Sequence, residues 1–391
     1  MLKELDRLIS INIPFEETAN IKKFESFMNN GDPPCDYERQ LLENHEKMLS
    51  TVLDGKIVPP YEVEIQPSSS CNLACKHCFG KVLTNKNLPN GIGNSEMISI
   101  INKLNEFKVN DFKVETVKFC GTTGEPLVNP AIIPGIELLN DLGKEIIVFT
   151  NGLNLDLLYG KKKYLDYVLK TDKVNVSLDA GSEEIFKNLK GALGFERIVH
   201  SLEEMVSKRD SSKGLDPRLT VSYVIGTDNY GEIFKTAELM KKVGVDEIRY
   251  RVDFTNLDFI HKISPEIKAG LKGAEALDLK DGKFTVNSVY TDKDISKDSS
   301  AFNSKGLKCY NKHFWACIGP DANVYACGHK TYSGINPYGN ILEKSFKDIW
   351  TSKERIKDLG CLTGEECKFC SPSSVRRNVF VNFLDELRKQ N

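Results

Sequence analysis

The chain has 391 residues, and its 53 basic and 55 acidic side chains give a formal net charge of −2. This balance offers no broad basic field for nucleic acid, and the apolar runs are too short to span a bilayer. The N-terminus, Met1-Leu-Lys-Glu-Leu-Asp-Arg, lacks the apolar stretch of a signal peptide. Eleven cysteines in such a chain indicate metal or redox chemistry in a reducing cytoplasm.

The order of the expected elements indicates the fold class. Residues 1–58 are expected to form a helical extension, and from Tyr61 onward strands alternate with helices. The expected strands cover 62–66, 116–119, 145–149, 173–178, 219–225 and 247–252, and the helices lie near 37–53, 96–107, 130–142, 158–170, 195–208, 230–243 and 264–275. This alternation predicts an α/β fold with a parallel sheet over 59–290. We expect a polar linker at 291–308 and a cysteine-bearing α+β module at 309–391.

Three cysteines follow the first expected strand, in the run Cys71-Asn-Leu-Ala-Cys75-Lys-His-Cys78. Thiolates at this spacing can hold three corners of a cubane iron–sulfur cluster and leave the fourth iron without a protein ligand. An open metal position can bind a small molecule directly, as catalytic metals do. A zinc knuckle is the alternative, but such sites usually take four ligands and no fourth lies close by.

This cysteine spacing resembles that of the radical S-adenosylmethionine (radical SAM) enzymes. The resemblance implies a 4Fe-4S cluster that binds SAM, whose reductive cleavage gives a 5′-deoxyadenosyl radical, and an electron donor such as flavodoxin or ferredoxin. It also implies a partial (β/α)6 barrel of the TIM type, with the cysteine loop at the carboxyl ends of the strands. An iron–sulfur sensor without turnover is the non-enzymatic alternative, and it would lose the residues that contact SAM.

Polar residues at several strand ends resemble the SAM contacts of this family. The run Cys120-Gly-Thr-Thr-Gly-Glu-Pro126 resembles a Gly-Gly-Glu-Pro turn that receives the SAM ammonium group. His77 would pack near the adenine, and Lys190 stands where relatives often carry an arginine for the SAM carboxylate. The resemblance implies a cofactor site of His77, Gly124, Glu125, Pro126, Asn151, Ser177, Asp179 and Lys190. Each polar strand-end residue has the alternative of a turn or cap role.

Two features are candidates for substrate chemistry. The period-2 pattern of the sixth strand puts Arg249, Arg251 and Asp253 on one face. They are substrate contacts if that face lines the barrel, and a solvated stripe if it faces outward. Cys120 could return a hydrogen atom to a substrate radical, or it could be a small buried apolar residue.

A second cysteine group lies in the last quarter of the chain: Cys309, Cys317, Cys327, Cys361, Cys367 and Cys370. A hairpin with its turn at 319–323, a helix ending near Trp350 and a final Cys-x2-Cys resemble the SPASM/Twitch extension of radical SAM enzymes. That extension holds one or two auxiliary clusters, and Ala322 departs from its usual turn glycine. No cysteine follows Cys370, which favours one auxiliary 4Fe-4S cluster on Cys309, Cys327, Cys367 and Cys370.

Two other assignments of these cysteines stay open. One is a cluster on Cys309, Cys317, Cys327 and Cys370, and the other is a four-cysteine zinc site. In the preferred set, Cys317 is a residue of the hairpin and Cys361 is a spare or alternative ligand.

An auxiliary cluster near the substrate favours oxidation, because it can accept the electron left after hydrogen abstraction. We predict dehydrogenation of a small polyol or sugar-type metabolite. The alternative is a ribosomal-peptide maturase that crosslinks, epimerises or oxidises a precursor peptide. Such enzymes often carry a leader-binding domain, and residues 1–58 look too short and too helical for one.

Overall fold

The computed structural model describes residues 41, 43–78, 80, 88–122, 124–253, 256–278, 283–288, 306–332, 337–363, 367 and 370–389. The first 40 residues and most of the expected linker, 291–305, lie outside the described residues. No helix in the described ranges is both long enough and apolar enough to cross a membrane.

One ten-stranded sheet forms the centre of the molecule, in the order β11-β10-β9-β8-β5-β4-β1-β12-β13-β14. Neighbouring strands are parallel from β11 to β12. The strands of this part are β1 (Glu62–Ile65), β4 (Thr116–Phe119), β5 (Glu145–Thr150), β8 (Lys173–Ser177), β9 (Arg218–Ile225), β10 (Glu247–Val252) and β11 (Thr285–Ser288). The prediction of an α/β fold with a large, mostly parallel sheet is confirmed, and all six expected strands are present.

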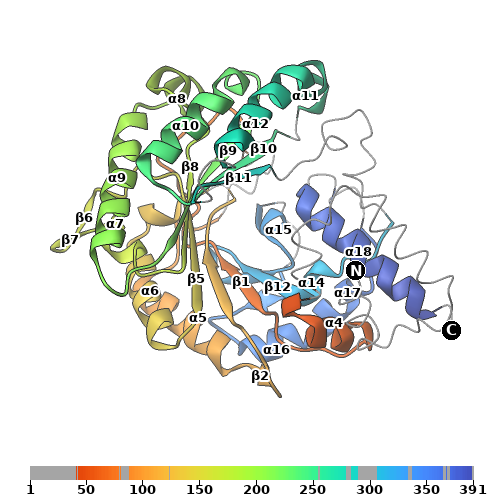
Figure 1. Ribbon diagram of the computed structural model, residues 1–391. Helices are drawn as coiled ribbons and strands as arrows, with labels where there is room; N and C mark the ends of the chain where they lie inside the picture. The colour runs from red at the N-terminus through yellow and green to blue at the C-terminus, as the bar shows by residue number, and fades with distance from the viewer. Residues whose placement is uncertain are drawn as a thin grey trace.

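Helices cover one face of this sheet, as Figure 1 shows. They are α5 (Asn94–Glu106), α6 (Ile132–Asp141), α7 (Tyr164–Val168), α8 (Glu183–Lys190), α9 (Phe195–Ser211), α10 (Ile233–Val243), α11 (Leu257–Lys262) and α12 (Ser264–Asp278). Alternate strand residues such as Val63, Val117, Val148, Val221 and Ile248 are buried in one core with these helices.

The expected helix at 158–170 is wrong in its first half. Leu158–Tyr159 (β6) and Lys162–Lys163 (β7) pair antiparallel, and Gly160 between them has φ +62°. A side chain is strained in that left-handed conformation, which suits a tight hairpin rather than a helix. Helix α8 was not expected; the Ser182 hydroxyl caps it by accepting a hydrogen bond from Ile185 N at 3.4 Å.

The other face of the parallel strands β1, β4, β5, β8, β9 and β10 carries most of their polar side chains, and we call it the open face. Side chains alternate along a strand, so the neighbours of the core residues point to this face. Ile248, Tyr250 and Val252 belong to the helix-packed core, which places the partly exposed Arg249 and Arg251 on the open face. The open face also carries Glu62, Glu64, Lys118, Cys120, Phe149, Asn175, Ser177 and Ser222.

The C-terminal module extends the same sheet. Strand β12 (Trp315–Ile318) pairs parallel with β1, with Cys317 opposite Glu64, and β13 (Asn323–Tyr325) and β14 (Gly339–Asn340) continue antiparallel. The hairpin expected at 319–323 is therefore confirmed. Ala322 has φ +59°, so it takes the left-handed conformation for which a glycine was expected. The helices here are α14 (Asn311–Phe314), α15 (Gly328–Tyr332), α16 (Phe346–Trp350), α17 (Lys353–Leu359) and α18 (Pro372–Lys389).

A second, smaller core joins the two ends of the described chain. Helix α4 (Glu46–Leu53) buries Leu49 and Val52 against Phe314 of α14 and against Phe380 and Leu384 of α18. These helices lie together on the side of the molecule away from α9 and α10 (Figure 1). In the described part of the expected extension, helix α4 packs against the C-terminal module.

Candidate active site

The loop after β1 carries Cys71, Cys75 and Cys78, and main-chain hydrogen bonds fix it to two other elements. Glu125 N donates to Ser70 O at 2.8 Å, which joins the loop to the turn after β4. Ala74 N and Lys76 N donate to Lys190 O at 3.0 Å and to Leu189 O at 2.8 Å. The loop is therefore bound to the C-terminal end of α8, a helix that the sequence patterns did not reveal.

Cys75 and Cys78 are partly buried, and Cys71 is exposed. Burial raises the pKa of Cys75 to about 11, and the neighbouring Cys78 and Cys71 add to the shift. A bound metal cation would offset the cost of burying the thiolates, because metal ligation and deprotonation of the thiols are coupled. Within the described residues no three potential ligands already stand as a finished metal site. The fit to an iron–sulfur cluster rests on the donor chemistry, because three thiols stand on one loop within eight residues.

Glu125 lies at the centre of the adjacent turn and is only 3% exposed. Its Oε1 accepts hydrogen bonds from Leu127 N at 3.0 Å and Thr150 Oγ1 at 2.6 Å, and its Oε2 accepts one from Asn151 N at 2.7 Å. Burial raises the pKa of Glu125, although these hydrogen bonds oppose the shift. The carboxylate thus joins the turn after β4 to the end of β5.

Asn151 extends this connection to the cysteine loop. Its Nδ2 donates to Asn72 Oδ1 at 2.7 Å and lies 3.8 Å from Cys71 Sγ. Asn72 in turn donates from Nδ2 to Asn154 Oδ1 at 3.0 Å. The end of β5 therefore supports the first cysteine directly.

A buried charged triad supports the other side of the loop. Asp179, with φ +58°, follows β8 and accepts from Lys190 Nζ, from His77 Nε2 at 3.2 Å and from Val224 N at 2.7 Å. Against the cost of burial, Lys190 and His77 hold the pKa of Asp179 well below its usual range. Lys190 and Asp179 are buried, with side chains 4% and 3% exposed. Their charged groups therefore engage each other and the residue before Cys78.

The open face beside this loop holds a charged cluster that sequence reasoning missed. Lys118 Nζ lies 2.9 Å from Glu62 Oε1 and 3.4 Å from Glu64 Oε2. Although burial opposes it, these carboxylates hold the pKa of Lys118 well above its usual value. Burial raises the pKa of the Cys120 thiol, and the neighbouring Glu64 adds to the shift. The alternation of Glu62 and Glu64 with buried residues, just before the cysteine run, was a signal for this cluster.

Four cysteines of the C-terminal module influence one another. Burial raises the pKa of Cys309 to about 11, with Cys327 and Cys367 adding to the shift. Burial also raises the pKa of Cys370, and Cys309, Cys327 and Cys367 add to that shift as well. These four thiols thus affect one another's pKa, although the described residues do not form a finished metal-ligand group.

The remaining two cysteines of this module have other surroundings. Cys317 is 1% exposed on β12, where its Sγ lies 3.7 Å from Glu64 Oε1 and 3.5 Å from Thr331 Oγ1. Cys361 is exposed, and its Sγ lies 3.4 Å from Lys357 O. Cys317 thus contacts the open-face cluster, and Cys361 lies at the surface.

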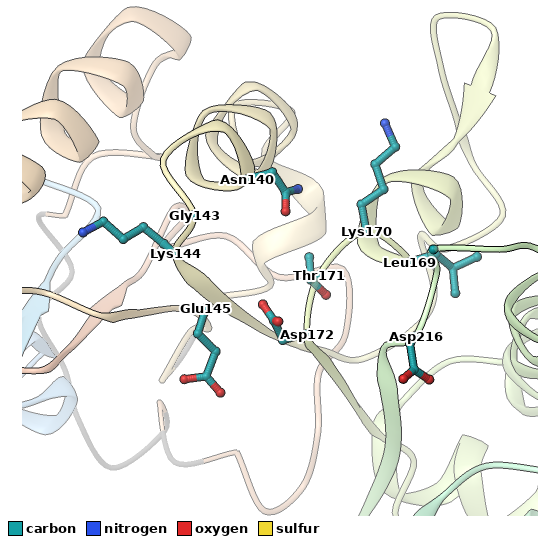
Figure 2. Close-up of a pocket in the computed structure, with 10 residues that line it drawn as sticks. Asn140, Gly143, Lys144, Glu145, Leu169, Lys170, Thr171, Asp172 and Asp216 are labelled. Atoms are coloured by element: carbon teal, nitrogen blue, oxygen red, sulfur yellow. The ribbon is translucent and has the colours of Figure 1, made fainter. Parts of the chain in front are cut away.

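A hollow of about 460 Å³ lies at the opposite edge of the sheet (Figure 2). Its lining includes Glu145 and Asp172, which stand at the amino ends of β5 and β8. Asp172 accepts a hydrogen bond from Ile146 N at 2.7 Å, and Lys144 Nζ donates to Val114 O at 2.6 Å. These charged groups support the sheet, and the hollow is remote from the cysteine loop.

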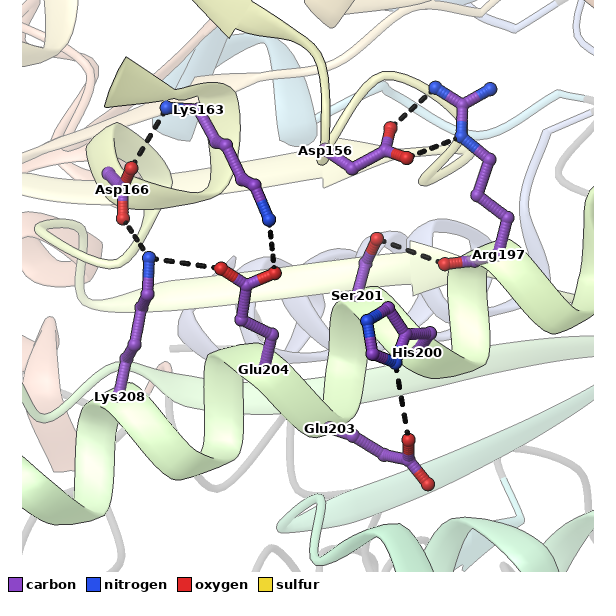
Figure 3. A network of polar contacts seen from close by, with 9 residues as sticks. All are labelled: Asp156, Lys163, Asp166, Arg197, His200, Ser201, Glu203, Glu204 and Lys208. Atoms are coloured by element: carbon purple, nitrogen blue, oxygen red, sulfur yellow. Dashed lines mark hydrogen bonds and ion pairs between the residues drawn. The ribbon is translucent and has the colours of Figure 1, made fainter. Parts of the chain in front are cut away.

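Ion pairs between α9 and the preceding segment form a separate surface network (Figure 3). Lys163 and Lys208 meet Glu204 at 2.6 Å and 3.1 Å, and Asp156 pairs with Arg197, whose side chain is 44% exposed. Exposed pairs of this kind contribute little stability each, and none contacts the cysteines.

Two family models match the chain. The model described as "Radical SAM superfamily" matches residues 65–259, and SPASM, described as "Iron-sulfur cluster-binding domain", matches residues 309–371. A Saccharolobus islandicus protein named "Probable GTP 3',8-cyclase" is 30% identical over 194 residues, which are 49% of this chain and 56% of that protein. The chain thus spans little more than half the length of this curated relative.

Two solved structures share the fold. SuiB from Streptococcus suis, bound to its precursor peptide SuiA, superposes with a TM-score of 0.58 at 15% identity over 81% of this chain and 70% of SuiB. The anSMEcpe structure with bound AdoMet gives 0.53 at 18% identity over 76% of this chain and 82% of that one. At these identities the likeness concerns the fold alone.

Proposed function

Because the chain is a member of the radical SAM superfamily with a C-terminal SPASM iron–sulfur domain, we propose that it oxidises a small polyol or sugar-type metabolite. When bound, the first cluster and SAM would supply a carbon radical that removes a substrate hydrogen, and the auxiliary cluster would supply an acceptor for the electron that remains. We also propose that strands β1 to β10 curve around the open face as a partial (β/α)6 barrel.

The chain would hold the SAM-binding cluster through Cys71, Cys75 and Cys78. Gly124, Glu125 and Pro126 would form the turn at the ammonium end of SAM, with Asn151 and Ser177 at the neighbouring strand ends. Asp179 and Lys190 would act mainly as positioning residues, because their charged groups already bind each other and His77. A flavodoxin or ferredoxin could approach the exposed Cys71, Asn72 and Lys76.

The closeness of the Cys327–Gly328 backbone to the open face is the observation that supports the oxidation. Gly328 follows Cys327 directly, and a methyl group on Gly328 would stand 2.8 Å from Glu64 Oε1 and 3.0 Å from Gln66 Nε2. The backbone beside Cys327 therefore contacts the open face. A cluster on Cys309, Cys327, Cys367 and Cys370 would border the face where the substrate has to bind, which suits the removal of an electron from it.

The open face offers charged groups and a thiol as substrate contacts. Arg249, Arg251 and Asp253 supply charge on β10, and the thiol of Cys120 stays protonated because its pKa is raised. A protonated thiol can return a hydrogen atom, so Cys120 suits epimerisation as well as structural packing.

Peptide maturation is the second candidate. The observation that favours it is the likeness in fold to SuiB, a protein solved with a precursor peptide. That likeness supports a shared scaffold for large substrates.

The proposed function can be tested with anaerobically reconstituted protein, SAM and a reductant. We expect 5′-deoxyadenosine from the wild type and none from Cys75→Ala. In a panel of carbon-deuterated polyols, deuterium should enter 5′-deoxyadenosine and the polyol should lose two hydrogen atoms. Modification of a precursor peptide with no polyol turnover would select the second candidate, and wild-type protein that never cleaves SAM would refute both.

A further inference from the structure

Arg251 carries a charge on the open face that no described residue neutralises. It is the penultimate residue of β10, and its side chain is partly buried. Its Nε is shielded from solvent and has no hydrogen-bond partner within the described part of the chain. An N–H donor that is shielded from solvent is costly unless an acceptor meets it.

The carboxylate that is linked to the strand residue opposite Arg251 is already in use. Arg251 stands opposite Val224 of β9, and Val224 N donates to Asp179 Oδ1 at 2.7 Å. Asp179 also binds Lys190 and His77. Its negative charge is therefore balanced without Arg251.

The same face is rich in cations at the amino ends of β8, β9 and β10. Glu247, 4% exposed, lies 3.5 Å from Lys173 Nζ, 3.0 Å from Arg218 Nε and 3.8 Å from Arg249 Nε. One carboxylate thus faces three cations, and Arg251 adds a fourth. Asp253 follows the last residue of β10 and is the other carboxylate beside these cations, so cations remain in excess across β8 to β10.

A second unpartnered donor lies deeper on this face. Asn175 of β8 is completely buried, and its Oδ1 accepts from Ser222 Oγ at 2.7 Å. Its Nδ2 has no hydrogen-bond partner among the described residues. Buried donors are normally paired, so two unpaired donors on one face indicate an acceptor-bearing ligand.

We propose that Arg251 binds an anionic group of the substrate, a carboxylate or a phosphate. The planar guanidinium matches both groups, because two of its N–H donors can meet two oxygens at once. The inference deepens the proposed function, on which it rests, by assigning the substrate a charged group. A phosphorylated sugar and a sugar acid are both of this class.

The test titrates inorganic phosphate and succinate into the reconstituted full-length protein by calorimetry, at constant ionic strength in chloride. Arg251→Gln should lower the affinity for at least one of these probes about tenfold, the usual scale for a lost charge-assisted contact. Arg251→Lys should fall in between, since it keeps the charge and loses the fork. Arg218→Gln is the matched control, because it removes a cation of the same face that already pairs with Glu247, and it should stay close to wild type.

Two results would overturn the proposal. The first is equal anion affinity in wild type and Arg251→Gln when both hold the same amount of iron. The second is a loss of SAM affinity in Arg251→Gln as large as its loss of affinity for phosphate or succinate, which would make the SAM carboxylate the anion that Arg251 binds. SAM cleavage is scored separately: a wild type that binds phosphate through Arg251 and never cleaves SAM would sink the proposed function and leave the anion site standing.

Discussion

Asp179→Asn probes how the cysteine loop is held in place. Asparagine keeps the size of the side chain and tolerates the φ of +58° at this position. It can still accept a hydrogen bond from Val224 N, but it removes the negative charge beside Lys190. The substitution therefore isolates the electrostatic part of the triad.

The expected cost follows from burial. Lys190 and Asp179 have side chains 4% and 3% exposed, so removal of the carboxylate leaves a buried ammonium group without its counter-ion. Breaking a buried pair from one side typically costs about 3–5 kcal/mol. Because Lys190 O accepts the hydrogen bond of Ala74 N, the loosened segment also carries the loop. We expect less retained iron in the variant.

Denaturant unfolding of the reconstituted protein, together with iron content, measures both effects. Asp156→Asn is the matched control: it removes a carboxylate whose partner Arg197 is 44% exposed, and it should cost at most about 1 kcal/mol. Adding Lys190→Met to Asp179→Asn should recover much of the loss, because no unpaired charge then remains buried. The buried charge pair does not hold the loop in place if Asp179→Asn costs no more than Asp156→Asn, or if the double variant is no more stable than Asp179→Asn.

Three further predictions concern other parts of the molecule. Cys367→Ala should spare SAM cleavage and impair substrate oxidation, whereas Cys361→Ala, at an exposed position, should alter neither. If Cys367→Ala gives the full yield of oxidised product, the auxiliary cluster takes no part in the mechanism. Burial lowers the pKa of His45 to about 4, whereas the imidazole of the unfolded chain titrates near 6.5. Between these two pH values the unfolded chain binds more protons, so the free energy of unfolding falls as the pH falls through this window. In urea unfolding at pH 4.5, His45→Phe should recover about 1–2 kcal/mol of the lost free energy of unfolding, after allowance for the partial exposure of His45. An unchanged dependence of stability on pH in this variant would show that His45 is not the group responsible. Gly328→Ala would place a methyl group 2.8 Å from two side-chain oxygens and should lower the free energy of unfolding by about 1–3 kcal/mol. Gly226→Ala is the control, because the space around Gly226 is open, and it should be close to neutral. Equal effects of the two substitutions on the denaturation midpoint would disprove the close approach at Gly328.

Much of the fold could be predicted because the strands are short apolar or alternating runs between turn residues. The expected strand at 116–119 and the one at 247–252 agree with β4 and β10 residue for residue. The hairpin β6–β7 was missed because its Leu, Tyr and Lys residues also suit a helix, and only the turn at Gly160 decides between the two. The parallel pairing of β12 with β1 joins residues about 250 positions apart, as Cys317 and Glu64 show, and no local pattern encodes such a contact.

The site was predictable where the chemistry depends on spacing along the chain. The spacing of Cys71, Cys75 and Cys78 alone indicates a radical SAM enzyme, and the matched family confirms that assignment. Lys190 shows the limit: the sequence suggested a contact with SAM, and the structure shows a buried ion pair with Asp179. The SAM contact stays a prediction, because the partner of a long side chain is decided by tertiary packing.

We propose that the chain binds two iron–sulfur clusters on separate cysteine sets. Iron and sulfide content after anaerobic reconstitution tests it most directly, in wild type and in a variant with Cys71, Cys75 and Cys78 all replaced by Ala. With about four irons per cubane, the account predicts ~8 irons in wild type and ~4 in the variant. A content of ~4 that falls to none would contradict it, since the C-terminal cysteines would then hold no cluster.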